Sequence, residues 1–321
     1  MRDVLSVVLL STTQLMGIRG LNTCLIKTAP HVFYTMGWES AKGRRIGVDI
    51  QCFMYRALSN HLNPVDVITE QLRTFAKLEI VPIYVFDGPP PAEKEAVVAK
   101  RRTDRREAAT KIADLRQQLL VAGEEERSHL ENEIHLLEAA HPQLTYEMKD
   151  EIKRIFDVEQ IHYINSSSEA DTVLAHLYRR EVIDYVASFD MDFLARCVKL
   201  LVPSHINAKP GERWTLLDPV QIQDALKLSD SQFLDLCVLM GSDYTPNLPI
   251  VPWTVALRSL QRRMGLAEIW SRHTFSNWRR SGVEVKTVSE ITMLNDARNI
   301  LSGVYDRPDI MIDSMTWTAR A

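Results

Sequence analysis

The sequence predicts an α/β fold, a parallel twisted sheet with crossover helices, and two observations carry this prediction. From about Arg44 to Pro203, short apolar segments alternate with amphipathic helical segments, which is the pattern of strands joined by helices that cross over a sheet. Three of the apolar segments run directly into an aspartate, at the strand end where parallel sheets form their sites. We therefore expect acidic side chains along one edge of the sheet.

Hydrophobic periodicity places the individual elements. Strands are expected near Ile46, Ile83, Ile161, Val186 and Leu200, with helices between them at residues 53–60, 64–78, 145–156 and 169–180. A polar, helix-prone stretch at 92–140 interrupts the alternation once. After residue 217 the pattern becomes helical, with helices expected at 219–226 and 229–240. A helical C-terminal part should therefore pack on the sheet.

Composition excludes several classes of protein. The 321 residues, 45% hydrophobic, can bury a full core in one large or two modest domains. The net charge of −4 argues only weakly against a nucleic-acid partner, because acids set aside for a metal would hide a basic surface elsewhere. Four cysteines without Cys-x-x-Cys spacing indicate a reducing, intracellular compartment and no zinc site. Residues 4–10 loosely resemble a signal peptide but lack its basic flank, and no run is long enough to span a membrane.

Several acids stand at the ends of the expected elements. Asp49, Asp87 and Asp190 each follow an apolar strand segment, and Asp243 follows the helix expected at 229–240. Asp190 and Asp192 form an Asp-x-Asp, which in extended backbone points both carboxylates the same way. Taken alone, such a pair is more often part of a loop than a ligand pair.

Two more acids begin a helix. Glu169 and Asp171 follow three serines at 166–168, an N-cap pattern, so both should fall in the first turn, where the helix dipole favours negative charge. Good capping is the simpler explanation for either acid by itself. Five separate segments nevertheless supply acids to one expected sheet edge, and this convergence favours a common function.

Carboxylates gathered in this way repel one another unless a cation lies among them. Magnesium, which prefers oxygen ligands, fits this requirement. Seven acids are too many for one ion, so the sequence predicts two, as in two-metal hydrolysis of a phosphodiester. No Ser-His-Asp, Walker or Gly-x-Gly-x-x-Gly pattern competes with this interpretation.

The polar stretch at 92–140 has a basic first half and an acidic second half. A solvated helical hairpin held by ion pairs would explain this charge pattern without any function. Lys94 and Arg101, however, are seven residues apart, so on a helix they share a face and both could reach one phosphate. There they would stabilise the transition state of phosphodiester hydrolysis.

Together these motifs resemble the flap endonuclease family, the XPG-type structure-specific 5′ nucleases, over about residues 16–260. The resemblance rests on the segments 16–21 (Met-Gly-Ile-Arg-Gly-Leu), 48–49 (Val-Asp), 85–91 (Val-Phe-Asp-Gly-Pro-Pro-Pro), 99–102 (Ala-Lys-Arg-Arg), 168–171 (Ser-Glu-Ala-Asp), 190–194 (Asp-Met-Asp-Phe-Leu) and 239–244 (Leu-Met-Gly-Ser-Asp-Tyr). It implies a PIN-like nuclease fold with a helical arch through which a 5′ single strand passes.

The resemblance also implies roles for particular residues. The seven acids would be ligands of two Mg²⁺ ions, with Mn²⁺ as a substitute, and Lys94 and Arg101 the basic pair that acts in catalysis. The expected DNA contacts are Gly17, Tyr55, Arg73, Lys100 and Arg102. The regions would be an extension at 1–15, nuclease regions at 16–91 and 144–245, an arch at 92–143, and a helical C-terminal region at 246–321 with a degenerate helix-two-turn-helix.

The chain departs from the family at several points. Pro249-Ile250-Val251-Pro252 stands where a Gly-Ile-Gly core is usual, the segment between Asp49 and Asp87 is short, and no sliding-clamp peptide is found near the C-terminus. Asp171 replaces a frequent glutamate. These departures favour a divergent member, of the kind that large DNA viruses carry. In the family the N-terminal glycine lies near the active site, so the resemblance implies either that Met16 is the functional start or that residues 1–15 fold away.

We therefore expect a monomeric nuclear enzyme, in the host nucleus if the source is viral, that acts on flapped or branched DNA in replication or repair. A 5′-to-3′ exonuclease and a junction resolvase of the same superfamily are alternatives. A non-catalytic DNA-binding protein is a third, disfavoured because all seven acids are present.

Overall fold

A computed structural model describes residues 16–204, 213–245, 248, 250–281 and 287–303. The extension at 1–15 and Pro249 lie outside the described residues. A seven-stranded sheet forms the centre, in the order β1-β7-β6-β5-β2-β3-β4. The strands are β1 (Tyr34–Gly37), β2 (Arg45–Asp49), β3 (Val81–Phe86), β4 (Tyr163–Asn165), β5 (Tyr185–Ala187), β6 (Leu200–Pro203) and β7 (Arg213–Leu217).

The five strands from β6 to β4 are parallel, which confirms the predicted fold class. β7 and β1 add an antiparallel edge that the sequence did not predict. Trp38 and Trp214 stack beneath this edge, with ring centroids 5.0 Å apart, and the Trp214 indole donates a hydrogen bond to the Gly37 carbonyl at 2.8 Å. Burial of two large rings therefore stabilises a strand pair too short to be recognised from periodicity.

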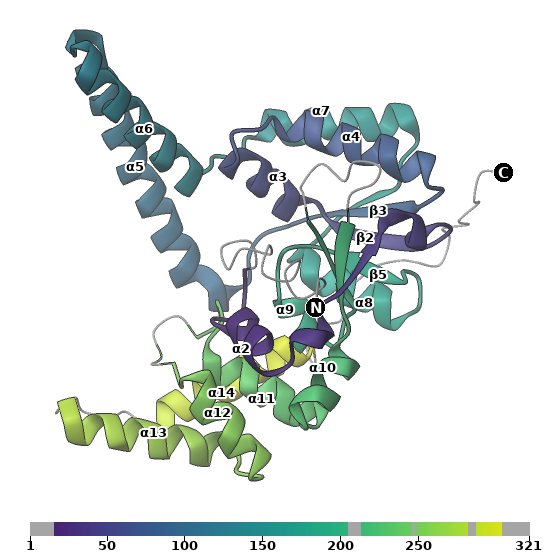
Figure 1. Ribbon diagram of the computed structural model, residues 1–321, viewed down its shortest axis with the longest axis vertical. Coiled ribbons are helices and arrows are strands. Elements are labelled where there is room, and N and C mark those ends of the chain that lie inside the picture. Colours follow the sequence, from purple (N-terminus) through teal and green to yellow (C-terminus); the bar gives the residue numbers. More distant parts are fainter. Residues whose placement is uncertain (1–15, 205–212, 246–247, 249, 282–286, 304–321) are drawn as a thin grey trace.

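Helices cover both faces of the sheet (Figure 1). On one face lie α3 (Ile50–Ser59), α4 (Pro64–Lys77) and α7 (Tyr146–Glu159), and on the other lies α8 (Ala170–Arg179). α2 (Leu21–Thr28) precedes the sheet, and α9 (Asp192–Ala195) follows β5. Aromatic contacts join α7 to the sheet, where Phe156 lies 4.5 Å from the Tyr84 ring of β3. These packed layers hold the C-terminal strand ends rigidly.

The C-terminal part is helical and lies below the sheet in the view of Figure 1. They are α10 (Pro219–Leu226), α11 (Asp230–Met240), α12 (Trp253–Gln261), α13 (Leu266–Ser281) and α14 (Thr287–Ser302). A capping box between Ser229 and Gln232 begins α11, and Asp218 caps α10. Among the described residues, no helix is both long and apolar enough to cross a membrane.

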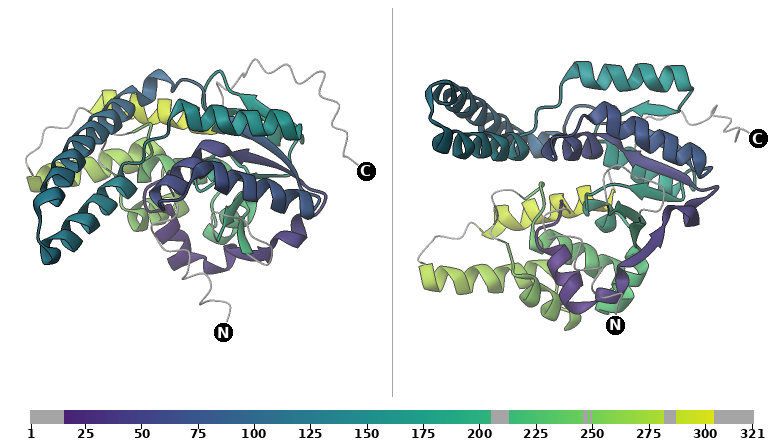
Figure 2. Two further views of the ribbon diagram at one scale, coloured as in Figure 1. Left: turned by 90° about the horizontal axis from the view of Figure 1, so that it is seen from above. Right: turned by 45° about the horizontal axis from the view of Figure 1, so that its top comes forward.

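The polar stretch forms a helical hairpin that stands out from the body (Figure 1, Figure 2). The short helix η3 (Ala92–Lys94) leads into α5 (Glu95–Val121), which is followed by α6 (Glu124–Ala140). Leu115, Leu130 and Ile134 form a small buried seam between the helices. Ion pairs close the outer half, Lys111 with Glu133 and Arg116 with Glu138, each at 2.7 Å. The ion-paired hairpin expected as the simpler alternative therefore describes this outer half.

Candidate active site

Asp49 ends β2 and begins α3. Its carboxylate accepts hydrogen bonds from the backbone N–H of Cys52 at 3.3 Å and from the Ser188 hydroxyl at 2.8 Å. Burial raises the pKa of Asp49 well above its ordinary value, and repulsion from Asp87 and Asp190 raises it further. Asp49 is thus a fixed, buried carboxylate that shares its surroundings with two other acids.

Asp87 follows β3 and caps a helix that belongs to a distant part of the chain. Its carboxylate accepts hydrogen bonds from the Ala170 N–H at 2.7 Å and from the Gln51 amide. The three serines were expected to cap this helix, but Glu169 occupies the N-cap position and its side chain makes no capping hydrogen bond. Asp87 instead accepts from the first backbone N–H of the helix. Burial raises the pKa of Asp87 despite these two hydrogen bonds.

Gly88 makes this arrangement possible. Its N–H donates to the Ser168 carbonyl at 2.6 Å, and a Cβ at this position would collide with the Ser166 carbonyl oxygen and come within 2.8 Å of that of Ser168. Only glycine allows the loop before α8 to approach the end of β3 so closely. The Asp-Gly pair therefore brings Asp87 and the start of α8 together.

Glu169 and Asp171 both face the acid cluster, each beside a cation. Lys94 contacts Glu169 at 2.6 Å, and the Tyr244 hydroxyl donates to the same carboxylate at 2.9 Å. Burial and repulsion from Asp171 raise the pKa of Glu169, and Lys94 opposes them. Burial also disfavours a charged Asp171, but Arg196 at 3.2 Å and Lys94 outweigh it and hold the pKa of Asp171 below its ordinary value.

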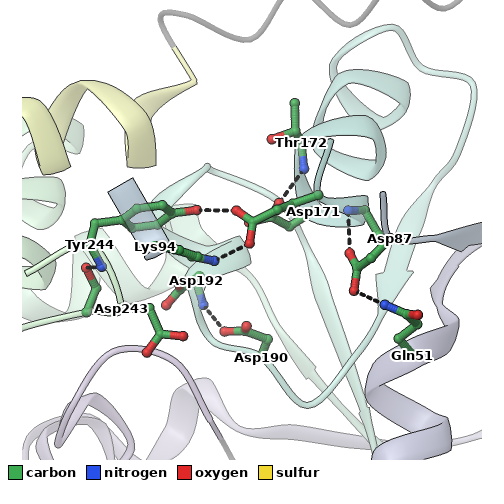
Figure 3. Close-up of polar contacts among 12 residues, drawn as sticks. Gln51, Asp87, Lys94, Asp171, Thr172, Asp190, Asp192, Asp243 and Tyr244 are labelled. Atoms are coloured by element: carbon green, nitrogen blue, oxygen red, sulfur yellow. Dashed lines mark hydrogen bonds and ion pairs between the residues drawn. The ribbon is translucent and has the colours of Figure 1, made fainter. Parts of the chain in front are cut away.

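Asp190 and Asp192 come together by a different geometry from the extended one predicted. Met191 has helical backbone angles, Asp192 is the first residue of α9, and Asp190 accepts a hydrogen bond from the Asp192 N–H at 2.9 Å. Burial raises the pKa of Asp190 to about 6, and burial together with repulsion from Asp190 raises the pKa of Asp192 well above its ordinary value. The prediction of an extended Asp-x-Asp was therefore wrong, although both carboxylates do lie in the cluster (Figure 3).

Gly17 lies directly against this pair. Met16 forms a parallel bridge with Asp190, and Gly17 has a φ of +85°. A Cβ on Gly17 would collide with the Asp190 Oδ1 atom and lie 2.5 Å from that of Asp192. Gly17 therefore sets the close approach of the N-terminal segment to the acids, and its predicted contact with DNA stays a prediction.

Both cations of the predicted basic pair reach the acid cluster. Lys94 lies over the Tyr244 ring, 4.5 Å from its centroid. Arg101 contacts Asp243 at 2.7 Å. Burial opposes the charge of Lys94, but the surrounding Tyr244, Asp171 and Glu169 outweigh it, so that its pKa is raised. The hairpin base thus places one partly buried cation, Lys94, and one exposed cation, Arg101, on the acids.

The other predicted DNA contacts lie away from these bonds. Tyr55 is partly buried on α3, and the Arg105 guanidinium of the hairpin lies 5.4 Å from its ring centroid. Arg73 is exposed on α4 and pairs with Glu70 at 3.5 Å. Lys100 and Arg102 are exposed on α5, and neither forms an ion pair with any side chain that the structure describes.

Four residues that contact the acids were not predicted from the sequence: Gln51, Ser188, Arg196 and Tyr244. Ser188 directly follows β5 and stands two residues before Asp190, and Tyr244 directly follows Asp243, so position in the sequence alone could have suggested both. Arg196 gave no signal, because an arginine at the end of a short helix is usually exposed, whereas this side chain is only 1% exposed. The contact of Gln51 gave no local signal, because it joins the start of α3 to Asp87 at the end of β3.

The carboxylates of the acid edge are the side chains that could hold a metal ion. Among the described residues, no three His, Cys, Asp or Glu side chains are arranged to ligate one ion as they stand, and Lys94, Arg101 and Arg196 each contact a carboxylate. The chemistry nevertheless fits a hard cation. Every acid offers oxygen, and Asp192 Oδ1 is buried without a hydrogen-bond partner. The site thus has unsatisfied negative charge of the kind that a divalent ion neutralises.

Comparisons with known proteins agree with the predicted family. Residues 16–108 match the XPG N-terminal domain and residues 160–243 the XPG I-region. Flap endonuclease 1-A of Sorghum bicolor is 28% identical over 273 residues, covering 79% of this chain and 68% of the relative. The human Flap endonuclease 1 is also 28% identical over 273 residues, covering 80% and 69%.

Solved structures share the fold. The catalytic core of Rad2 in complex with DNA substrate aligns with a TM-score of 0.61 and 18% identity, covering 94% of this chain and 90% of that one. Human GEN1 in complex with Holliday junction DNA aligns with a TM-score of 0.57 and 13% identity, covering 92% and 68%. Fold and site together define a nuclease, a hydrolase that acts on phosphodiester bonds. The chain belongs to the XPG-type flap endonuclease family, which confirms the resemblance seen in the motifs.

Proposed function

We propose that this protein is a magnesium-dependent, structure-specific endonuclease that cuts DNA at the base of a 5′ flap. One observation carries the proposal. Acids from separate segments meet at one sheet edge, where Lys94 lies among them (Figure 3), and Arg101, also from the base of the helical hairpin, contacts Asp243. A site that brings both charges together in this way is suited to a phosphodiester, whose oxygens need cations and whose attacking water needs a negative environment.

Two Mg²⁺ ions, or Mn²⁺ in their place, would be held by Asp49, Asp87, Glu169, Asp171, Asp190, Asp192 and Asp243. When bound, such ions lower the pKa of a water and offset charge on the leaving oxygen. Hydrogen bonds from Ser188 and Gln51 would hold two of these acids, Asp49 and Asp87, in a fixed orientation.

The hairpin would supply the cations that bind the substrate's phosphate at this site. Lys94 and Arg101 are bound to acids here, and a scissile phosphate would take over both cations once divalent ions neutralise the carboxylates. They would then stabilise the charge that develops on the phosphate oxygens. Lys100 and Arg102, exposed on the same helix, would contact the backbone of the single strand that passes the hairpin, and Tyr55 would stack on a base. Arg73 would bind a phosphate farther away.

We further propose that the enzyme works as a monomer in the nucleus, in DNA replication or repair. A junction resolvase is the second candidate, supported by the fold shared with GEN1, whose structure holds Holliday junction DNA. Val251 is buried and Ile250 exposed in the altered helix-two-turn-helix segment, so the grip on duplex DNA would differ from that of typical members.

The test is cleavage of end-labelled oligonucleotides with magnesium, using a 5′ flap, a nick, a gap and a four-way junction in parallel. A single cut at the flap base, absent in the Asp190→Ala variant, would support the flap endonuclease. Symmetrical cuts in the junction alone would support the resolvase instead. Stepwise release of nucleotides from the 5′ end would support an exonuclease, and binding without any cut would support a non-catalytic protein.

A further inference from the structure

Two lysines on α7 lie beside the Asp87 end of the acid cluster. Lys149 falls in the first two turns of this helix and Lys153 four residues later, so the two share one face. The Lys153 ammonium lies 4.9 Å from the centroid of the Phe86 ring, directly before Asp87 in the sequence. Asp87 also acts electrostatically on Lys149. In Figure 3, Asp87 lies at the opposite end of the cluster from Asp243, the acid that Arg101 contacts.

These lysines differ from the other cations of the site because neither contacts a carboxylate among the described residues. Lys94, Arg101 and Arg196 each contact a carboxylate at 3.2 Å or less. Neither Lys149 nor Lys153 forms an ion pair with a side chain that the structure describes, although both are partly buried. A lysine normally extends into water unless something holds it.

Their mutual position is electrostatically unfavourable. Burial lowers the pKa of Lys149, and the neighbouring charge of Lys153 lowers it further, while Asp87 opposes both effects. Like charges four residues apart on a helix repel each other. An anion bound between the two ammonium groups would offset this repulsion. Divalent ions that neutralise Asp87 would remove its attraction for Lys149 and so strengthen the binding of such an anion.

We propose that Lys149 and Lys153 form a binding site for a backbone phosphate of the DNA substrate, at the Asp87 end of the acid edge. The site would hold the strand on the side opposite the contact that Arg101 provides, so that the scissile phosphodiester is fixed from both ends. This proposal rests on the proposed function, because it places the phosphate on a strand that enters the nuclease site.

The test is the salt dependence of flap DNA binding in EDTA, which prevents cleavage. In the variant Lys149→Met/Lys153→Met, methionine keeps the apolar stem that covers Phe86. Loss of one phosphate contact should lower the slope of log K against log salt by about 0.9 and weaken binding several-fold at moderate salt. The matched control is Arg154→Met, an exposed cation on the same helix, which should leave the slope unchanged.

The outcomes separate the two proposals. An unchanged slope in the double variant, with a wild type that binds and cuts flap DNA, would overturn this inference alone. A wild type that neither binds nor cuts would overturn the proposed function. If the double variant does not fold, Lys149→Met alone leaves Lys153 over the Phe86 ring and is expected to lower the slope in the same direction. An equal loss of slope in Arg154→Met would show a diffuse charge effect and contradict a specific site.

Discussion

The acid edge and the basic base of the α5–α6 hairpin carry opposite charges, and they hold those charges by opposite means. At the edge, backbone N–H groups fix the carboxylates: Cys52 binds Asp49, Ala170 binds Asp87, and Asp192 binds Asp190. In the hairpin, α5 buries only Ala108 and Leu115 along 27 residues. The edge is therefore preorganised by the fold, whereas the hairpin positions its cations through side chains.

This difference indicates which part can adapt to a substrate. A carboxylate held by backbone amides keeps its position when a ligand arrives, as a catalytic group must. Lys94 and Arg101 are held by ion pairs with the acids, and an ion pair can be exchanged for a phosphate without any change in the fold. Substitutions in the acid edge and in the hairpin test this difference.

The largest effect is expected at the edge. Asp190→Asn removes one negative charge but keeps the size of the side chain, and we expect the cleavage rate to fall about 1000-fold, at the upper end of losses for a group that stabilises the transition state. The affinity for flap DNA should change little, because the acid does not attract phosphate. Single-turnover cleavage and equilibrium binding measure the two quantities. Cleavage at the wild-type rate would exclude Asp190 from the chemistry.

The buried ion pair beneath the edge should affect stability rather than chemistry. Arg196→Met leaves Asp171 charged and without its buried cation, at a cost of about 3 kcal/mol in the free energy of unfolding. Urea denaturation without metal measures the loss. Adding Asp171→Asn should restore part of it, because the uncompensated charge is then gone. If the losses in the free energy of unfolding from the two substitutions were simply additive, the pairing of Arg196 with Asp171 would not be what stabilises the fold.

In the hairpin, Lys94→Met should slow cleavage about 100-fold at saturating DNA, because a contact to the transition state is lost. Lys111→Met is the matched control, since Lys111 lies on the same helix but pairs with Glu133 in the outer half. The control should cut at the wild-type rate. Equal losses in both variants would mean that the hairpin acts through its overall charge.

The smallest effect is expected for the exposed cations of α5. Lys100→Met/Arg102→Met should lower the salt slope of flap binding by about 1.8, or 0.9 for each lost phosphate contact. Fluorescence anisotropy with labelled DNA at several salt concentrations gives this slope. A slope equal to that of the wild type would remove these residues from the DNA path.

Much of this arrangement could be predicted from the sequence because strand ends are local signals. The apolar segments before Asp49, Asp87 and Asp190 mark strands whose C-terminal ends must meet at one edge of a parallel sheet. The seven-residue spacing of Lys94 and Arg101 likewise predicted that both would reach one site. The assignment of the acids as metal ligands, and of the DNA contacts, stays a prediction.

The features that could not be predicted depend on long-range contacts. The helix cap that Asp87 provides for α8 joins residues 83 positions apart, and no N-cap pattern near the helix reports it. Whether Met191 turns helical between two aspartates depends on the bridge between Met16 and Asp190. β1 has four residues, none of them fully buried, so its periodicity is too weak to recognise without its partner strand.

The acid edge should hold divalent ions, and calorimetric titration of Mg²⁺ measures this binding. We expect saturable binding of two ions in the presence of flap DNA, measured with the slowly cutting Lys94→Met variant. We also expect that Asp190→Asn, added to this variant, weakens the binding or removes one of the two ions. Binding that is absent, or unchanged when Asp190 is neutralised, would contradict a metal site at this edge.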